Sequence, residues 1–122
     1  MAVVADDLPD YLAREVPGFG DSPERLALAE RGDRPAEVAD AAGRYLLRLQ
    51  RAEIRRLAEP EESAALARGY AVIEELAESD DPAVRAALLT ILDRLHSDDV
   101  VVAVAETRLG VRSLALYRRW AV

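Results

Sequence analysis

Apolar residues recur at intervals of three and four along almost the whole chain, which is the spacing of one face of an α-helix. The clearest case is the stretch 82–95, where the apolar face is formed by Val84, Ala87, Leu88, Ile91, Leu92 and Leu95. Similar stripes predict helices over residues 8–16, 23–31, 36–59, 60–77 and 111–120. No alternating apolar and polar run with hairpin turns occurs, so no sheet is expected.

Residues 98–109 are rich in valine and would also suit a strand. We favour a helix, because Ser97 and two aspartates make a strong helix start and Leu109-Gly110 a good stop. The chain is therefore predicted to be all-α, a compact bundle of about seven helices in a single domain over residues 1–122. Two glycines lie inside predicted helices: Gly43 is expected to mark a close helix crossing or a kink, and Gly69 to let a neighbouring helix approach.

The tripeptide Ser-Asp-Asp occurs twice, at 79–81 and at 97–99, and each copy precedes a predicted helix. A side-chain oxygen at the helix start accepts a hydrogen bond from a free amide, and negative charge there suits the helix dipole. We therefore interpret both copies as N-caps. If the two turns lie side by side, Asp80, Asp81, Asp98 and Asp99 also form an acidic edge.

The first copy continues as Asp81-Pro82-Ala83-Val84-Arg85 and resembles the turn that opens the second helix of a HEAT repeat. The resemblance covers about 40 residues, from Leu66 to Gly110, and implies stacked helical hairpins in which the aspartate and the arginine stabilise the turn. On this resemblance the bundle would be a short HEAT-like stack. It implies nothing about chemistry.

A second resemblance extends over more of the chain. The segments "LARGYAVIEELAESDDPAV", "LLTILDRL" and "LGVRSLALYRRW" are similar to a family of small bacterial helical domains of unknown function. The matching positions are Leu76, Asp80, Val84, Leu109, Gly110, Leu116, Tyr117 and Trp120. The family has no established catalytic residues, and some small helical proteins of this kind are immunity-like.

The net charge of −7 argues against a nucleic-acid partner, because a nucleic-acid-binding surface needs clustered basic residues. A basic protein partner suits the acidic chain better. All 16 basic residues are arginine, which together with the residue usage suggests a bacterial source. No apolar run is long enough for a membrane span, and the N-terminus lacks the pattern of a signal peptide. A cytoplasmic protein without membrane contact is expected.

Candidate chemistry is sparse. The chain has no cysteine and one histidine, His96, and no P-loop, G-x-S-x-G or G-x-G-x-x-G motif. His96 with Asp98 and Asp99 could form a metal or acid–base site, but a helix-end histidine explains the same residues. We expect no catalytic residues, no metal and no cofactor.

The sequence thus predicts a non-catalytic protein-binding module, immunity-like or an adaptor, that binds a basic partner. Its predicted contact residues are Asp80, Asp81, Asp98, Asp99, Tyr117 and Trp120; Arg85 is expected to support its turn. The arginine pairs 55–56 and 118–119 are interpreted as solvated helix ends. One alternative is a small enzyme or ligand-binding protein using His96 with a nearby carboxylate. Another is a structural subunit or homodimer that associates through the end containing Tyr117 and Trp120.

Overall fold

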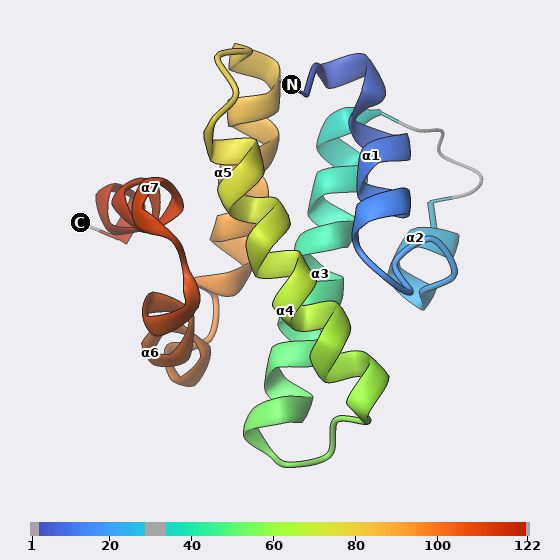
Figure 1. The fold of residues 1–122 in the computed structure, drawn as a ribbon, viewed down its shortest axis with the longest axis vertical. Helices are drawn as coiled ribbons and strands as arrows, with labels where there is room; N and C mark the ends of the chain where they lie inside the picture. The colour runs from blue at the N-terminus through green and yellow to red at the C-terminus, as the bar shows by residue number, and fades with distance from the viewer. Residues whose placement is uncertain (1–2, 29–33, 122) are drawn as a thin grey trace.

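The computed structural model describes residues 3–28 and 34–121, with side chains as far as Arg118. Seven α-helices and one short 3-10 helix account for most of these residues, and no strand occurs among them, which confirms the all-α prediction (Figure 1). The elements are η1 (Ala5–Asp7), α1 (Leu8–Glu15), α2 (Pro23–Leu26), α3 (Pro35–Ile54), α4 (Pro60–Ala77), α5 (Pro82–Leu95), α6 (Asp99–Arg108) and α7 (Val111–Ala121). In the described part of the chain, no helix is long and apolar enough to cross a membrane.

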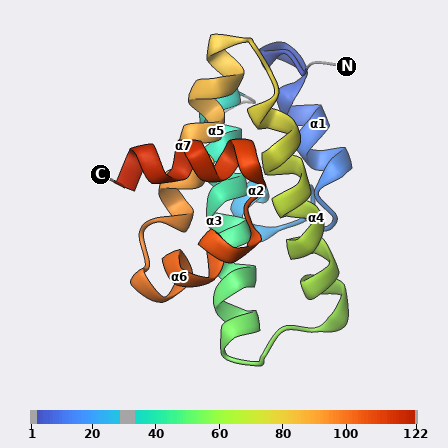
Figure 2. The same ribbon diagram turned by 60° about the vertical axis from the view of Figure 1, so that its left-hand side comes forward.

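Helix α3 is the centre of the bundle. It packs most extensively against α5 and also contacts α1, α2, α4 and α6. Helices α3, α4 and α5 follow one another up and down through short connections, with α1 and α2 on one side and α6 and α7 on the other (Figures 1 and 2). Helix α7 crosses α4 and α5, which it contacts. Because α3 touches five other helices, its surface residues lie close to several elements at once.

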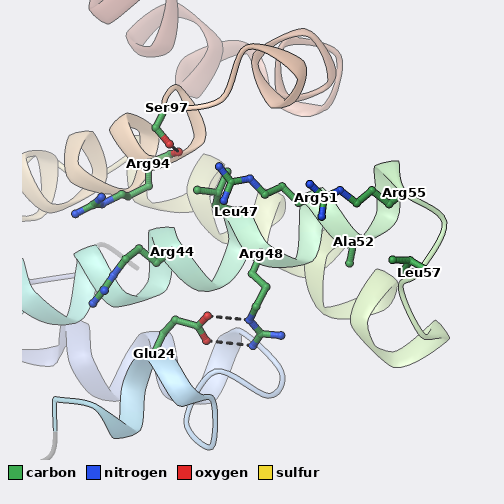
Figure 3. Close-up of a pocket in the computed structure, with 10 residues that line it drawn as sticks. All are labelled: Glu24, Arg44, Leu47, Arg48, Arg51, Ala52, Arg55, Leu57, Arg94 and Ser97. Carbon is green, nitrogen blue, oxygen red and sulfur yellow. Dashed lines mark hydrogen bonds and ion pairs between the residues drawn. The ribbon is translucent and has the colours of Figure 1, made fainter.

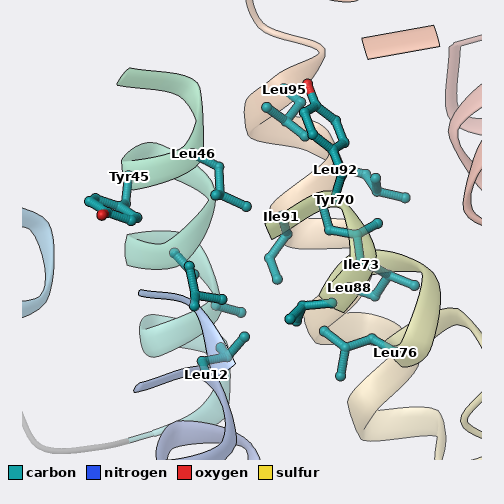
Figure 4. Packing of buried hydrophobic residues seen from close by; sticks show 14 of the residues in the cluster. Leu12, Tyr45, Leu46, Tyr70, Ile73, Leu76, Leu88, Ile91, Leu92 and Leu95 are labelled. Atoms are coloured by element: carbon teal, nitrogen blue, oxygen red, sulfur yellow. The ribbon is translucent and has the colours of Figure 1, made fainter. Parts of the chain in front are cut away.

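The core is formed where the apolar faces of α3, α4 and α5 meet, with α1 closing one end (Figure 4). Leu88, Leu92 and Leu95 of α5 have no exposed surface, and neither has Leu66 of α4. These are the positions that the three- and four-residue spacing places on one face. Burial of each large side chain contributes about 1.5–3 kcal/mol to folding, so this cluster is the main stabilising feature.

Gly43 lies where α3 crosses α5. A Cβ atom at Gly43 would stand 3.1 Å from the Cα of Ile91 and 2.9 Å from Cγ of Arg94. A Cβ at Gly69 would stand 2.4 Å from Cδ2 of Leu46. The prediction that both glycines allow close helix approach is confirmed.

Helix α3 ends earlier than predicted, at Ile54 rather than residue 59. The amide of Leu57 donates to the carbonyl of Ala52, and Arg56 adopts a left-handed φ of 60°. This is a Schellman-type end, a place that glycine normally occupies. The predicted second helix also ends earlier, at Leu26, and residues 29–31 of that prediction lie outside the described residues.

Helix α7 is capped from a distant helix. The carboxylate of Glu74 in α4 accepts from the amides of Ser113 at 2.8 Å and Arg112 at 3.2 Å. Gly110 permits this contact, since a Cβ there would stand 2.5 Å from Cδ of Glu74. The valine-rich segment before it is helical, as predicted, and forms α6.

Candidate functional site: an arginine groove on helix α3

The first Ser-Asp-Asp turn fixes the start of α5 and the N-terminal segment. Asp81 is the N-cap and accepts from the amides of Ala83 at 2.9 Å and Ala5 at 3.1 Å. These backbone hydrogen bonds, that from Ala83 first, lower the pKa of Asp81. Arg85 donates to the carbonyl of Ser79 at 3.2 Å, so it supports the turn as expected. Asp80 is exposed.

The second turn has a similar structural role. Asp98 is the N-cap of α6 and accepts from the amides of Val100 at 3.0 Å and Val101 at 3.4 Å. It also accepts from Nε of Arg51 at 2.8 Å, and this hydrogen bond is the main reason its pKa is lowered. Asp99 is exposed. Both turns therefore cap helices, as the sequence predicted, and the capping residues are Asp81 and Asp98.

The two turns are not neighbours. Asp81 precedes α5 and Asp98 follows it, and a helix of 14 residues is about 20 Å long. The expected continuous acidic edge is therefore not formed: Asp80 and Asp99 are exposed, one before the start of α5 and the other after its end.

Tyr117 belongs to the core. Its side chain has no exposed surface, and its hydroxyl donates to the carbonyl of Leu95 at 3.2 Å. Burial is the main cause that raises the pKa of Tyr117 to about 12. A fully buried side chain offers a partner no surface, so the expectation that Tyr117 is a contact residue needs correction. The side chain of Trp120 lies outside the described residues.

His96 ends α5, and its ring centroid lies 5.2 Å from that of Tyr117. Among the described residues His96 has no hydrogen bond or ion pair with a carboxylate, and no group of three or more potential metal ligands is found. The partly exposed imidazole therefore has no acid–base partner in this part of the chain.

A groove along α3 was not predicted from the sequence, which indicated only that Arg55 lies at a solvated helix end (Figure 3). Arg44, Arg48 and Arg51 project from successive turns of α3, Arg55 is the C-cap of that helix, and Arg94 joins them from α5. The groove has a volume of about 620 Å³, and Leu47, Ala52 and Leu57 add apolar surface to it. We call this feature the arginine groove. Its signal in the sequence is the four, three, four spacing of the α3 arginines, which places them on one helix face.

Carboxylates from three elements pair with these arginines. Arg48 binds Glu24 of α2 through two hydrogen bonds of 2.8 and 3.1 Å, and these lower the pKa of Glu24. Arg44 and Arg94 share Asp40, at 3.2 and 2.6 Å. Four of the five arginines thus pair with Glu24, Asp40 and Asp98, and Glu62 lies farther from Arg48, at 3.8 Å. Positive charge exceeds negative charge in the groove.

Hydrogen-bonding capacity also remains in the groove. A guanidinium carries five N–H donors. Within the described residues, Arg51 and Arg94 donate hydrogen bonds through Nε, and their Nη groups donate none. Arg55 forms no ion pair with a described residue. The side chains of Arg44, Arg48 and Arg51 are each 45% exposed, so an anion can reach them.

The chemistry of the groove is that of anion binding. Planar guanidinium groups recognise carboxylates through paired hydrogen bonds, as Arg48 does with Glu24. Nothing in the groove is arranged as a nucleophile beside a general base. No protein-family model, curated protein or solved structure matches this chain.

Proposed function

We propose that this chain is a non-catalytic protein-binding module whose arginine groove binds an acidic segment of a partner protein. The observation that carries the proposal is the convergence of five arginines on one groove that also has apolar surface, with unused Nη donors on Arg51 and Arg94. Arginine and apolar side chains together are typical of the centres of protein interfaces.

An acidic partner is favoured over the basic partner suggested by the net charge. The acidic turns are separated by the length of α5, whereas the arginines of α3 lie on consecutive turns of one helix. The two acidic turns therefore do not form one continuous acidic surface. The protein remains a candidate immunity-like or adaptor protein. Its proposed contact surface is now basic, where the sequence had suggested an acidic one.

A protein segment is favoured over a nucleic acid. The chain carries a net charge of −7, which repels an extended polyanion at long range. The groove is locally positive, and Glu24, Asp40 and Asp98 already offset part of its charge. A short acidic segment needs only the local field, because screening reduces the effect of charges beyond roughly 8–10 Å.

An enzyme that uses His96 as an acid–base residue has less support than a binding module. A general base must lie within hydrogen-bonding reach of the group that it deprotonates or that orients it. His96 instead stacks at an angle beside the buried ring of Tyr117. The arginine groove has better defined chemistry, so binding is the function we propose.

The test is a binding titration monitored by fluorescence anisotropy, with a labelled peptide of glutamates and serines as the probe. We compare the wild type with Arg44→Gln/Arg55→Gln, which neutralises two groove arginines. The matched control is Arg112→Gln/Arg118→Gln, which changes the net charge equally at exposed positions on α7. The proposal predicts at least tenfold weaker binding for the groove variant and little change for the control. Equal losses in both variants, or no binding by the wild type, would contradict it.

A further inference from the structure

A second, smaller hollow adjoins the arginine groove. It has a volume of about 200 Å³, and its apolar wall is formed by Ile54 at the end of α3 and by Val100 and Val101 in the first turn of α6. The side chain of Val100 is 59% exposed, while Val101 is fully buried and anchors α6 to the core. Val101 thus holds the first turn of α6 in place, and Val100 presents an accessible apolar side chain to the hollow.

Two arginines connect the hollow to the groove. Arg51 and Arg55 line both, and Asp98 stands at the edge of the smaller one. A carboxylate bound by either arginine is therefore adjacent to an apolar surface. Leu57, which is 71% exposed, adds apolar surface to the groove next to Arg55.

We infer that the preferred ligand is an acidic peptide segment with a large apolar side chain beside its carboxylates. In this arrangement the carboxylates bind Arg51 and Arg55, and the apolar side chain enters the hollow between Ile54 and Val100. The inference rests on the proposed function and deepens it by naming the class of segment. The positive charge of the arginines favours a segment with carboxylates. Burial of apolar surface in the hollow favours a large apolar side chain next to those carboxylates.

A polyanion without apolar side chains fits this pair of sites less well. The phosphates of a nucleic acid would reach the arginines but would leave Val100 and Ile54 in water. The combined site is therefore better matched to a mixed acidic and apolar segment.

The experiment compares three labelled probes of equal length: a glutamate–leucine peptide, a glutamate–serine peptide and a single-stranded DNA oligonucleotide. We expect the glutamate–leucine peptide to bind about five- to tenfold more tightly than the glutamate–serine peptide, as partial burial of one leucine implies. Val100→Ser should abolish that difference without removing the arginine contacts. Val111→Ser is the matched control, because Val111 is 87% exposed in the first turn of α7, and it should preserve the difference.

The outcomes separate the inference from the proposed function. If both peptides bind the wild type equally, the inference is wrong and the proposed function stands. If neither peptide binds, the proposed function fails and the inference fails with it. Tighter binding of the oligonucleotide than of both peptides would also overturn the inference. Circular dichroism spectra of both variants establish that each retains its helices, so that a loss of binding reports on the site.

Discussion

The Nε atom of Arg51 lies 2.8 Å from Oδ2 of Asp98 and donates a hydrogen bond to it. The other oxygen of Asp98 caps α6 through the amides of Val100 and Val101. One carboxylate thus starts a helix and offsets the charge of a groove arginine that lies far away in the sequence. The second Ser-Asp-Asp turn thus contributes to the arginine groove, because its Asp98 holds Arg51.

Replacing Asp98 by asparagine should strengthen binding of an acidic peptide. Asparagine caps a helix about as well as aspartate, so α6 is retained, but the charge that competes for Arg51 is lost. We expect about two- to fivefold tighter binding in an anisotropy titration. Asp99→Asn removes the same charge from the adjacent, exposed residue and is the control. Equal effects of the two substitutions would show that the contact with Arg51 is irrelevant.

Replacing Gly43 by alanine should destabilise the fold. The added methyl group would stand 3.1 Å from the backbone of Ile91, and overpacking of this kind costs about 1–3 kcal/mol. The better helix propensity of alanine returns up to about 1 kcal/mol, so we expect a net loss of roughly 1 kcal/mol in urea unfolding. Gly20→Ala is the control, because its nearest neighbour would be 3.8 Å away. A more stable Gly43→Ala variant would disprove the close crossing of α3 and α5.

Replacing Arg56 by glycine should stabilise the chain. Arg56 has a φ of 60°, a conformation that costs a residue with a side chain about 1–2 kcal/mol. Glycine avoids this cost but gains freedom in the unfolded chain, so a net gain of about 0.5–1 kcal/mol in thermal unfolding is expected. The neighbouring Arg55 has a φ of −80°, and Arg55→Gly should give no gain. Similar gains for both variants would contradict the proposed end of α3.

Stability should fall at both extremes of pH. Hydrogen bonds lower the pKa of Glu15, Glu24 and Asp98 in the fold, so the unfolded chain binds more protons and stability decreases as the pH falls below about 4. Burial raises the pKa of Tyr117 to about 12, so its contribution is present below about pH 10 and is lost as the pH rises from 10 to 12.

Urea unfolding measured from pH 2 to 12 checks both limbs of this dependence. Glu24→Gln should make the acid limb less steep, and Tyr117→Phe should make the alkaline limb less steep. Unchanged slopes in these two variants would show that the groups do not titrate as described.

Most of the helices were predictable because they bury one apolar face, and because the Ser-Asp-Asp turns mark two helix starts by local chemistry alone. The separation of the acidic turns could also have been predicted, because the 14 residues of α5 between the two caps span about 20 Å. Only part of the arginine groove could be predicted from the sequence. The spacing of the α3 arginines is local, but the positions of Arg94 and Glu24 depend on how α5 and α2 pack against α3. The burial of Tyr117 likewise depends on where α7 docks.

The most direct test of the arginine groove is amide chemical-shift mapping by nuclear magnetic resonance, with the glutamate–leucine peptide titrated into the isotope-labelled chain. We expect the largest shifts on residues 44–57, in α3 and its C-terminal end, and on residues 94–101 at the α5–α6 turn. Largest shifts near Asp80 or along α7, with α3 unchanged, would contradict it.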